Sequence, residues 1–360
     1  MKMNMTFFTK LVSSFIWVAV CFVSLVSCDS VIYDDLPPCE INQKLKFVSD
    51  YNMLGVDAFN KYVSSVYVVA FDKSGKAAWT YSESGDALKA DGYAINLAST
   101  GCPPGTHTFV AWCGIDNRHL GATAESFDVP DVVIGRTTID ELQCRLNRTR
   151  DDVTGMSVSD RDLYPLYHGI LRDVTLSRHD NLDDNLDEEF TMYLMKNTNS
   201  VRVILQNLSG ENLNPDDFSY TIEESNGLMG FDNSLLPDET VVYKHWQRLG
   251  GMAEIDTDAR AQSSVHVAIG DLTIARLMAD RKSYLTIHND RDNRVVARIP
   301  LSEYALLVKD RYTDTMSDQE YLDRQDQYAL TFFLDRNLNW MSAEIYINSW
   351  HVMLDNVDFN

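Results

Sequence analysis

The hydrophobic pattern of the chain opens with one long uncharged stretch. Residues 11–28 contain no charged side chain and follow Lys2 and Lys10. A basic start, a short apolar run and a small residue before a cleavage point are typical of a secretory signal. A membrane-spanning helix also needs about 18 apolar residues, but no basic cluster follows this run, and Asp29 comes at once. The pattern therefore favours an exported chain.

From residue 41 onward, short segments of alternating apolar and polar residues replace the continuous run. Ile41, Leu45 and Phe47 alternate with polar residues, a period of two that predicts a half-buried strand. Turns rich in Gly, Pro and Asp separate the segments, and Gly75 is expected at a positive φ. This spacing predicts an all-β chain of β-sandwiches. The predicted strands are 41–48, 65–72, 93–97, 106–113, 190–194, 200–205, 220–222, 240–243, 265–269, 284–287, 295–299, 329–334, 343–347 and 350–354.

A few short helices are expected between the strands. Residues 57–63 read as one helical turn, and Thr138 with Glu141 fits a capping box that predicts a short helix through Leu146. Ser302 and Ser317 are predicted N-caps of two further helices. Two polar stretches are expected as connections, a turn over 196–199 and a very acidic loop over 180–189.

Length and composition favour two domains. Removing residues 1–27 leaves 333 of 360 residues, which is too many for one ordinary core. Hydrophobic residues at 45% and aromatic residues at 11% are enough to fill two cores. We expect a signal peptide over 1–27, an acidic spacer over 28–40 that includes Pro37-Pro38, an N-terminal β-sandwich over 41–168 and a C-terminal β-sandwich over 169–360.

The end of the signal carries a more specific pattern. Leu25-Val26-Ser27-Cys28 resembles the lipobox of bacterial lipoproteins, in which the Cys thiol receives a diacylglyceryl group and becomes the first mature residue. A plain secretory signal cut before an unrelated Cys is the alternative. Each buried methylene contributes about 0.8 kcal/mol, so a Cys28 that carries two or three acyl chains, such as palmitate, would hold the chain on a membrane.

The other cysteines point to disulfides. Cys21 leaves with the signal, which leaves four cysteines besides Cys28. An even number in an exported chain, without a C-x-x-C or Cys/His cluster, favours disulfides over a metal site. Three connectivities are open, and we expect the first or last of the four to pair with one of the middle two. The four are Cys39, Cys102, Cys113 and Cys144.

The charge of the chain limits its partners. The formal charge of −22 becomes −24 once Lys2 and Lys10 leave with the signal. A negative field of that size repels phosphate backbones, so nucleic acid is not an expected partner. It also keeps the body of the protein away from an anionic membrane surface, which leaves the lipid as the expected attachment.

The sequence lacks the common catalytic motifs. The chain has no G-x-S-x-G elbow, H-E-x-x-H, P-loop or G-x-G-x-x-G motif. Single strand histidines such as His107, His266 and His351 are read as packed or solvated. The acidic stretches 180–189 and 290–293 offer oxygen ligands for calcium, but neither matches an EF-hand loop, and both are read as solvated loops. Five tryptophans could form a sugar-binding platform, but most lie at strand-period positions where core packing is the preferred interpretation. They are Trp79, Trp112, Trp246, Trp340 and Trp350. We expect no enzyme, cofactor, metal or small-molecule substrate.

A series of short motifs, in a fixed order along the mature chain, resembles one family. With the lipobox, they are similar to the FimB-type anchor lipoproteins of Bacteroidia fimbriae, which are relatives of the fimbrillins. The motifs are at 57–59 (Asp-Ala-Phe), 66–75, 103–112 (Pro-Pro-Gly-Thr-His-Thr-Phe-Val-Ala-Trp), 166–169 (Leu-Tyr-His-Gly), 199–203, 299–304, 319–324 and 345–350.

The resemblance implies two transthyretin-like or Ig-like β-sandwiches in a surface lipoprotein of the outer membrane that holds the base of a fimbrium. Pilins of this superfamily polymerise by strand exchange, in which a protease removes a first strand and a neighbour's C-terminal strand fills the groove. Backbone hydrogen bonds and alternating side chains would set the strength and register of that pairing. The resemblance therefore implies fimbrial pilins as partners and an anchor that keeps its own first strand.

The resemblance implies a role for a segment near each end of the chain. Residues 41–48 are the predicted retained strand. Residues 350–360 alternate well enough to be offered to the first pilin, or they complete the second domain. A fimbrial tip or stalk subunit, a surface glycan-binding lipoprotein and a lipidated hydrolase are the rival classes.

Overall fold

The computed structural model describes residues 42–90, 92–122, 124–177, 187–257, 261–312 and 315–353. Strands make up 49% of the chain and helices 12%, which confirms the predicted all-β class. The predicted signal peptide and acidic spacer lie outside the described residues. In the part of the chain that is described, no helix has the length and apolar content needed to cross a bilayer.

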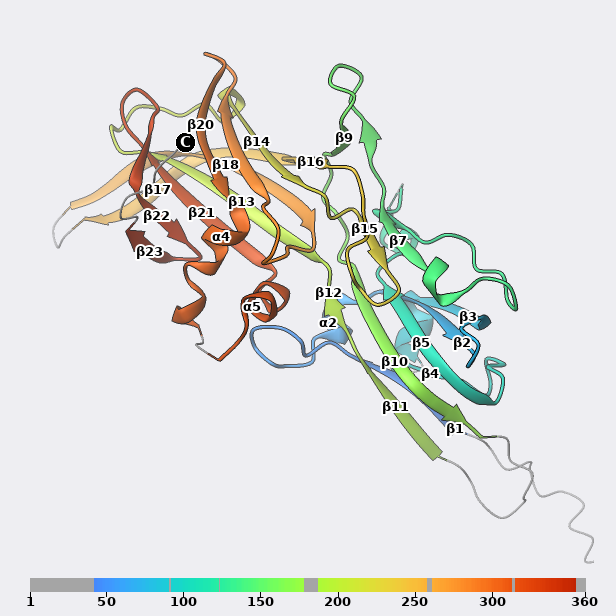
Figure 1. Cartoon of the computed structure of the whole chain (residues 1–360). Helices are drawn as coiled ribbons and strands as arrows, with labels where there is room; N and C mark the ends of the chain where they lie inside the picture. Colours follow the sequence, from blue (N-terminus) through green and yellow to red (C-terminus); the bar gives the residue numbers. More distant parts are fainter. Residues whose placement is uncertain are drawn as a thin grey trace, which may run out of the picture. The chain divides into compact units, whose positions relative to one another are not determined.

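Short strands follow one another along most of the described chain (Figure 1). The strands are β1 (Asn42–Val48), β2 (Ser65–Phe71), β3 (Ala77–Ser84), β4 (Ala94–Asn96), β5 (Gly105–Cys113), β6 (Phe127–Asp128), β7 (Gln143–Leu146), β8 (Thr149–Arg150), β9 (Ser157–Ser159), β10 (Tyr167–Leu176), β11 (Asp187–Tyr193), β12 (Met195–Lys196), β13 (Thr198–Asn207), β14 (Phe218–Glu224), β15 (Leu228–Gly230), β16 (Val241–Lys244), β17 (Gln247–Thr257), β18 (Ala261–Ala275), β19 (Tyr284–Asn289), β20 (Arg294–Pro300), β21 (Gln327–Leu334), β22 (Trp340–Ile347) and β23 (Trp350–Met353). The helices are α2 (Phe59–Tyr62), α3 (Gly85–Ala90), α4 (Leu301–Leu306) and α5 (Asp318–Arg324), with 3-10 turns η1 (Arg118–Leu120), η2 (Ile139–Glu141), η3 (Pro215–Asp217) and η4 (Lys309–Arg311).

The first sandwich combines a three-stranded sheet of order β11-β1-β4 with a five-stranded sheet of order β12-β10-β5-β2-β3. Leu45 and Phe47 from the smaller sheet share one buried core with Val68 and Phe109 from the larger one. Two inner faces that meet in one core are the packing of a β-sandwich. The opposite face of the larger sheet has a smaller core of its own, around Phe71.

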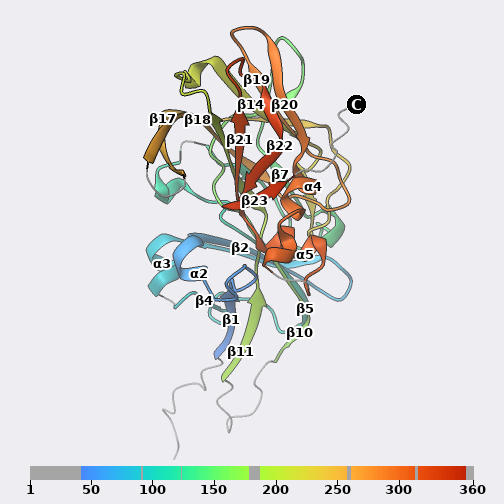
Figure 2. The same cartoon turned by 90° about the vertical axis from the view of Figure 1, so that its left-hand side faces the viewer.

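The second sandwich combines two six-stranded sheets, of orders β17-β18-β13-β21-β22-β23 and β20-β19-β14-β16-β9-β8. Figure 2 shows β21, β22 and β23 of the first of these sheets side by side. Val203 and Leu330 from one sheet share a core with Ile287 and Tyr220 from the other. Gly270 makes room for that packing, because a Cβ at this position would lie 2.3 Å from the Tyr220 ring. A small sheet of order β15-β7-β6 completes the described strands.

The sheets interleave along the sequence. The segments β8 and β9 come before residue 168, yet β9 pairs in parallel with β16 of the second sandwich. Conversely, β10 lies almost entirely after residue 168 and β11 lies wholly after it, yet these strands pair with β5 and β1 of the first sandwich. The predicted division into domains at residue 168 stays a prediction.

Several local predictions are confirmed. The helical turn is present as α2, Gly75 has a φ of 77°, and the Ser317 side chain caps α5 by accepting a hydrogen bond from the Glu320 N–H. The Glu141 carboxylate also accepts from the Thr138 N–H at 2.7 Å, as the capping box requires. These signals depend on neighbours in sequence, so tertiary packing does not override them.

Two predicted helix ends are wrong. The helix after Thr138 stops at Glu141, because residues 143–146 form strand β7, which pairs with β15 on one side and β6 on the other. The helix near Ser302 begins at Leu301 with Pro300 at the N-cap, and the Ser302 hydroxyl instead donates to the Arg281 carbonyl at 3.0 Å. In the first case, pairing with a distant strand replaces the predicted helix. In the second, the Ser302 hydroxyl binds a distant carbonyl and does not cap the helix.

The connections around β11 were also misread. The predicted turn over 196–199 is not a turn, because β12 and β13 follow each other with only Asn197 between them, and Asn197 is fully buried. The predicted acidic loop ends early: Asp187, Glu188 and Glu189 belong to β11. The rest of that loop lies largely outside the described residues.

Candidate functional site

The first described strand, β1, lies in the middle of its sheet. β11 pairs with it in parallel along its whole length, from Asn42 opposite Asp187 to Val48 opposite Tyr193. β4 pairs antiparallel on the other side. Both views show β1 and β11 side by side (Figures 1 and 2). The strand predicted at 41–48 is confirmed over 42–48, and it occupies a place within its own sheet.

Side chains on both faces fix β1 in this place. Leu45 and Phe47 are no more than 1% exposed, and the Phe47 ring stacks on Phe59 at 5.6 Å. Three polar side chains of β1 reach to acidic residues of β11. The pairs are Asn42–Asp187 (2.8 Å), Gln43–Glu188 (3.0 Å) and Lys46–Glu189 (3.3 Å).

The loop after β1 is held by its own polar side chains. The Asp57 carboxylate accepts from the Ser49 N–H at 2.9 Å and from the Phe59 N–H at 3.0 Å. The Arg324 guanidinium of α5 donates to the Asn52 carbonyl at 3.4 Å, and it lies 4.0 Å from the centre of the Tyr51 ring. These contacts join the end of β1 to a helix of the second sandwich, beside a groove of about 460 Å³.

The last described strand, β23, lies at the edge of its sheet. Among the described strands, its one partner is β22, through the four residue pairs between Glu344–Met353 and Ile347–Trp350. Trp350 is 40% exposed and makes an edge-to-face contact with Tyr312. Residues 354–360, the second part of the predicted donor segment 350–360, lie outside the described residues. An edge strand that is exposed and paired on one side can accept or donate a further strand.

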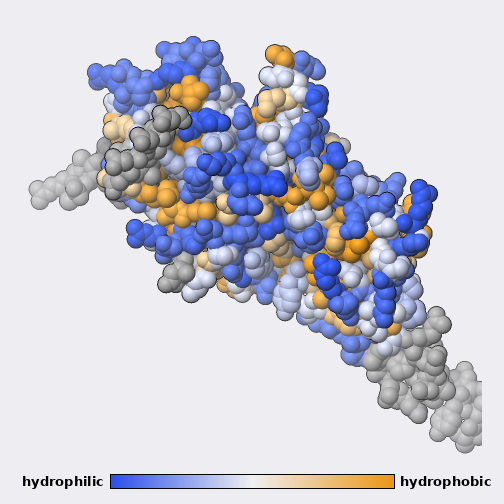
Figure 3. All heavy atoms as spheres, in the orientation of Figure 1, coloured by the Kyte–Doolittle hydropathy of each residue, from blue (hydrophilic) through white to orange (hydrophobic). Residues whose placement is uncertain are grey.

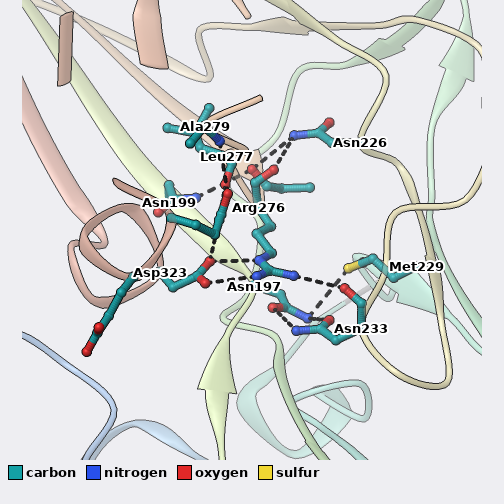
Figure 4. Close-up of polar contacts among 12 residues, drawn as sticks. Asn197, Asn199, Asn226, Met229, Asn233, Arg276, Leu277, Ala279 and Asp323 are labelled. Carbon is teal, nitrogen blue, oxygen red and sulfur yellow. Dashed lines mark hydrogen bonds and ion pairs between the residues drawn. The ribbon is translucent and has the colours of Figure 1, made fainter. Parts of the chain in front are cut away.

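A buried ion pair lies where β12 passes into β13 (Figure 4). The Arg276 guanidinium donates from Nε and Nη2 to both oxygens of Asp323, at 2.7 and 2.8 Å. Both side chains are nearly buried, at 12% and 5% exposed. The Gln319 amide donates to the same carboxylate at 2.9 Å. This bidentate pair links the end of β18 to helix α5.

Two asparagines extend the buried pair into a cluster. Arg276 Nη1 donates to the Asn233 carbonyl at 2.9 Å. The Asn233 and Asn197 side-chain amides bond to each other twice, at 2.6 and 3.1 Å. Asn197 also donates its N–H to the Leu166 carbonyl at 2.7 Å. The cluster therefore joins the loop after β15, the passage from β12 to β13 and the segment before β10.

One family model matches the chain over residues 36–356, that of the fimbrillin-A associated anchor proteins Mfa1 and Mfa2. The chain belongs to this family. The resemblance inferred from the ordered motifs is thereby confirmed.

Individual relatives agree with the family. The minor fimbrium anchoring subunit Mfa2 of Porphyromonas gingivalis is 25% identical over 223 residues, which is 61% of this chain and 61% of that relative's length. A solved structure of that organism's fimbrial anchor protein Mfa2 has a TM-score of 0.54 at 18% identity, covering 86% of this chain and 98% of its own. It shows the shared fold.

Two solved structures from Bacteroides thetaiotaomicron are more similar. A candidate adhesin is 30% identical, with a TM-score of 0.73, and the match covers 89% of this chain and all of that one. A candidate polysaccharide-binding protein is 29% identical, with a TM-score of 0.69, covering 88% of this chain and 99% of that one.

The cysteines of this anchor-family chain do not form the expected bonds within the described residues. Cys102, Cys113 and Cys144 are free and buried, so Cys144 is not paired with either of the other two as predicted. Each is enclosed by apolar neighbours in a core, and burial raises the pKa of the Cys102 thiol to about 12. Cys39 and Cys28 lie outside the described residues, and a bond to Cys39 and a lipid on Cys28 stay predictions.

The aromatic residues divide between core and surface in this family member. Trp79 and Trp112 are buried, as expected for core residues, whereas Trp246 and Trp350 are 37% and 40% exposed. Figure 3 shows apolar residues in small groups among polar ones on the face that it presents. Among the described residues, no group of three or more His, Cys, Asp or Glu side chains has the geometry to hold a metal ion.

Sequence reasoning missed the buried polar cluster. Asn197 lies in a stretch that reads as a solvated turn, and Arg276, Asp323 and Asn233 are far apart in the sequence. One signal was present: Asn197 stands between two strongly apolar strand segments, with no Gly or Pro to turn the chain. Its partners could not be found without the fold.

Proposed function

We propose that this protein anchors a fimbrium to the cell surface. A lipid on Cys28 holds it in the outer membrane, and it binds the basal pilin by β-strand complementation without catalysis. The observation that carries the proposal is the place of β1, which pairs on both sides within its own sheet. A pilin of this superfamily loses its first strand, whereas a tethered subunit that lost it would be severed from its lipid.

The comparisons support the same role. The chain belongs to a family of fimbrial anchor proteins, and a relative from P. gingivalis is called an anchoring subunit. In the sequence, the segment after Cys28 precedes β1, the first described strand, so a lipid on Cys28 would pull on the fold through β1. The C-terminal edge strand β23 is the proposed contact with the first pilin.

The first experiment tests the tether. Cells that carry Cys28→Ala in place of the native chain should shed their fimbriae into the medium, while the native chain keeps them attached. Cys21→Ala is the matched control, because Cys21 leaves with the signal peptide. Intact fimbriae on the Cys28→Ala cells, with that variant present at normal amount, would contradict the proposal.

The second experiment tests the anchor against the tip or stalk alternative. Mass spectrometry of the protein in purified fimbriae should find the mature N-terminus at an acylated Cys28. A tip or stalk subunit would instead begin beyond Val48, after loss of β1. Removal of residues 350–360 then tests donation: a folded, membrane-bound truncation that still holds fimbriae rules out β23 and its continuation as the donor.

Glycan binding is the second candidate function. It is favoured by the similarity to a candidate polysaccharide-binding protein and by the exposed aromatic pair of Trp350 and Tyr312. Arg311 lies 5.8 Å from the Trp350 ring and adds a hydrogen-bond donor beside it. Pull-down of the protein on surface polysaccharides would test this function, since anchoring needs no sugar. Trp350→Ala should then reduce the binding, whereas the control Trp79→Phe, at a buried position, should not.

A further inference from the structure

The strand that pairs with β1 leads without interruption into the centre of the second sandwich. β11 ends at Tyr193, β12 follows at Met195 and β13 begins at Thr198. β13 is an inner strand of its six-stranded sheet, flanked by β18 along Thr198–Gln206 and by β21 along Ser200–Asn207. A force on the second sandwich therefore reaches β11 through the backbone itself (Figure 1).

The direction of β1 decides how that force acts. β1 and β11 are parallel and in register over seven residue pairs. A membrane tether pulls β1 from its N-terminal end, whereas the second sandwich pulls β11 from its C-terminal end. The two strands are thus drawn in opposite directions along their common axis. The hydrogen bonds between neighbouring strands cross that axis, so the ladder is sheared and its bonds are strained together.

We infer that the β1–β11 pair is a mechanical clamp that keeps the tethered end of the protein folded while a fimbrium is pulled. This inference rests on the proposed anchoring function. A ladder loaded at the same end of both strands opens one bond at a time, whereas a sheared ladder must lose its bonds nearly at once. Parallel pairing is what places the two points of force at opposite ends.

Further contacts strengthen the pair against sliding. The backbone ladder continues past β1, because the Leu194 N–H donates to the Val48 carbonyl at 2.8 Å. On the side of β4, the Leu97 N–H donates to the Gln43 carbonyl at 2.8 Å. Any slip of β1 by one residue would carry Phe47 from the core to the opposite face. Sliding therefore costs the core contacts as well as the hydrogen bonds.

The buried polar cluster completes the path. Asn197 lies between β12 and β13, where the loaded chain passes from one sandwich to the other, and it is fully buried. Its two hydrogen bonds with Asn233, and the contact of Asn233 with Arg276, fix this passage against bending. The clamp and the cluster thus lie in series along one strand path.

Single-molecule pulling tests the inference on the purified mature chain with Cys28 and Cys39 replaced by Ser. One handle is a peptide tag at the N-terminus. The other is attached to Leu208→Cys, an exposed position just after β13, while the buried thiols stay unlabelled. The compared variants are Phe47→Leu in β1 and Phe71→Leu in β2. Both rings are buried, but Phe71 belongs to a separate core on the far side of its sheet.

Under constant force, Phe47→Leu should shorten the folded lifetime roughly tenfold, which corresponds to about 1.4 kcal/mol of barrier. Phe71→Leu should leave that lifetime within about twofold, although unfolding in urea without force should be faster in both variants. Equal shortening in the two variants, or no change in Phe47→Leu, overturns the inference. If Phe47→Leu does not fold, Leu45→Val and its control Leu142→Val replace the pair.

This experiment contains no fimbria and no membrane, so its failure differs from a failure of the proposed function. If the clamp holds under force but the Cys28→Ala cells keep their fimbriae, the pair resists shear in a protein that is not the anchor. If those cells lose their fimbriae but Phe47→Leu and Phe71→Leu rupture alike, the protein is the anchor and β1–β11 is not its clamp.

Discussion

Removing one partner of the buried Arg276–Asp323 pair should destabilise the protein strongly. The pair is bidentate, both side chains are nearly buried, and Asp323 also accepts from Gln319. Asp323→Leu would leave the Arg276 charge in an apolar setting with only the Asn233 carbonyl as an acceptor. Breaking a buried pair in this way costs about 3–5 kcal/mol, so the free energy of unfolding should fall by that amount.

The double variant shows why the pair matters. Replacing both partners by apolar residues, Arg276→Met with Asp323→Leu, removes the stranded charge and should recover most of the loss, because such replacements are often close to neutral. Urea unfolding followed by tryptophan fluorescence would give the four free energies of the cycle. Because the double variant should recover most of a loss of about 3–5 kcal/mol, the coupling energy between the two positions should be at least about 3 kcal/mol.

An exposed ion pair is the control. Arg118 and Asp116 lie 2.9 Å apart, but the Arg118 side chain is 74% exposed. Breaking this pair with Arg118→Ala should leave the free energy of unfolding almost unchanged, because solvent screens an exposed pair. If Asp323→Leu costs no more than this control, the buried cluster does not stabilise the junction, and our interpretation of Figure 4 is wrong.

Three further predictions concern burial. Burial lowers the pKa of His168 to about 4, below the usual 6.5. The stability that the neutral side chain contributes is therefore present above pH 6.5 and falls by about 3 kcal/mol toward pH 4. Urea midpoints measured against pH should show this loss, and His168→Gln should not. Gly270→Ala would place a Cβ against the Tyr220 ring, so it should lower the free energy of unfolding by about 1–3 kcal/mol and the melting temperature by several degrees. Gly251→Ala should have a much smaller effect, because its Cβ would meet only Val267, at 3.8 Å. An aromatic disulfide reagent should label Cys102, Cys113 and Cys144 only after unfolding, and labelling of the native protein at the same rate would contradict their burial.

Local signals in the sequence predicted the elements well where neighbours in sequence decide the structure. The alternation of Leu45 and Phe47 with polar residues gave β1, and the same alternation gave the strands of the second sandwich. Gly75 and the Ser317 cap were also readable, since the turn and the cap use only residues a few positions away. The all-β class followed from these segments taken together.

Pairing between distant strands could not be read in the same way. The acidic residues Asp187–Glu189 look solvated, because nothing in the sequence shows that the side chains of Asn42, Gln43 and Lys46 bond to them. Asn197 was misread for the same reason, since its buried partners belong to other loops. Strand alternation marks which side of a strand is buried, but it does not name the neighbour that buries it.

The separation between β1 and its main partner has a consequence for biogenesis. Asn42 bonds to Asp187, 145 residues further along the chain, so β1 is synthesised long before β11. Contacts of such high sequence separation slow folding and leave an apolar strand available for incorrect pairing. The amino-terminal sheet can close only after residue 193 has been synthesised, and until then β1 has an open edge that can pair with the wrong strand.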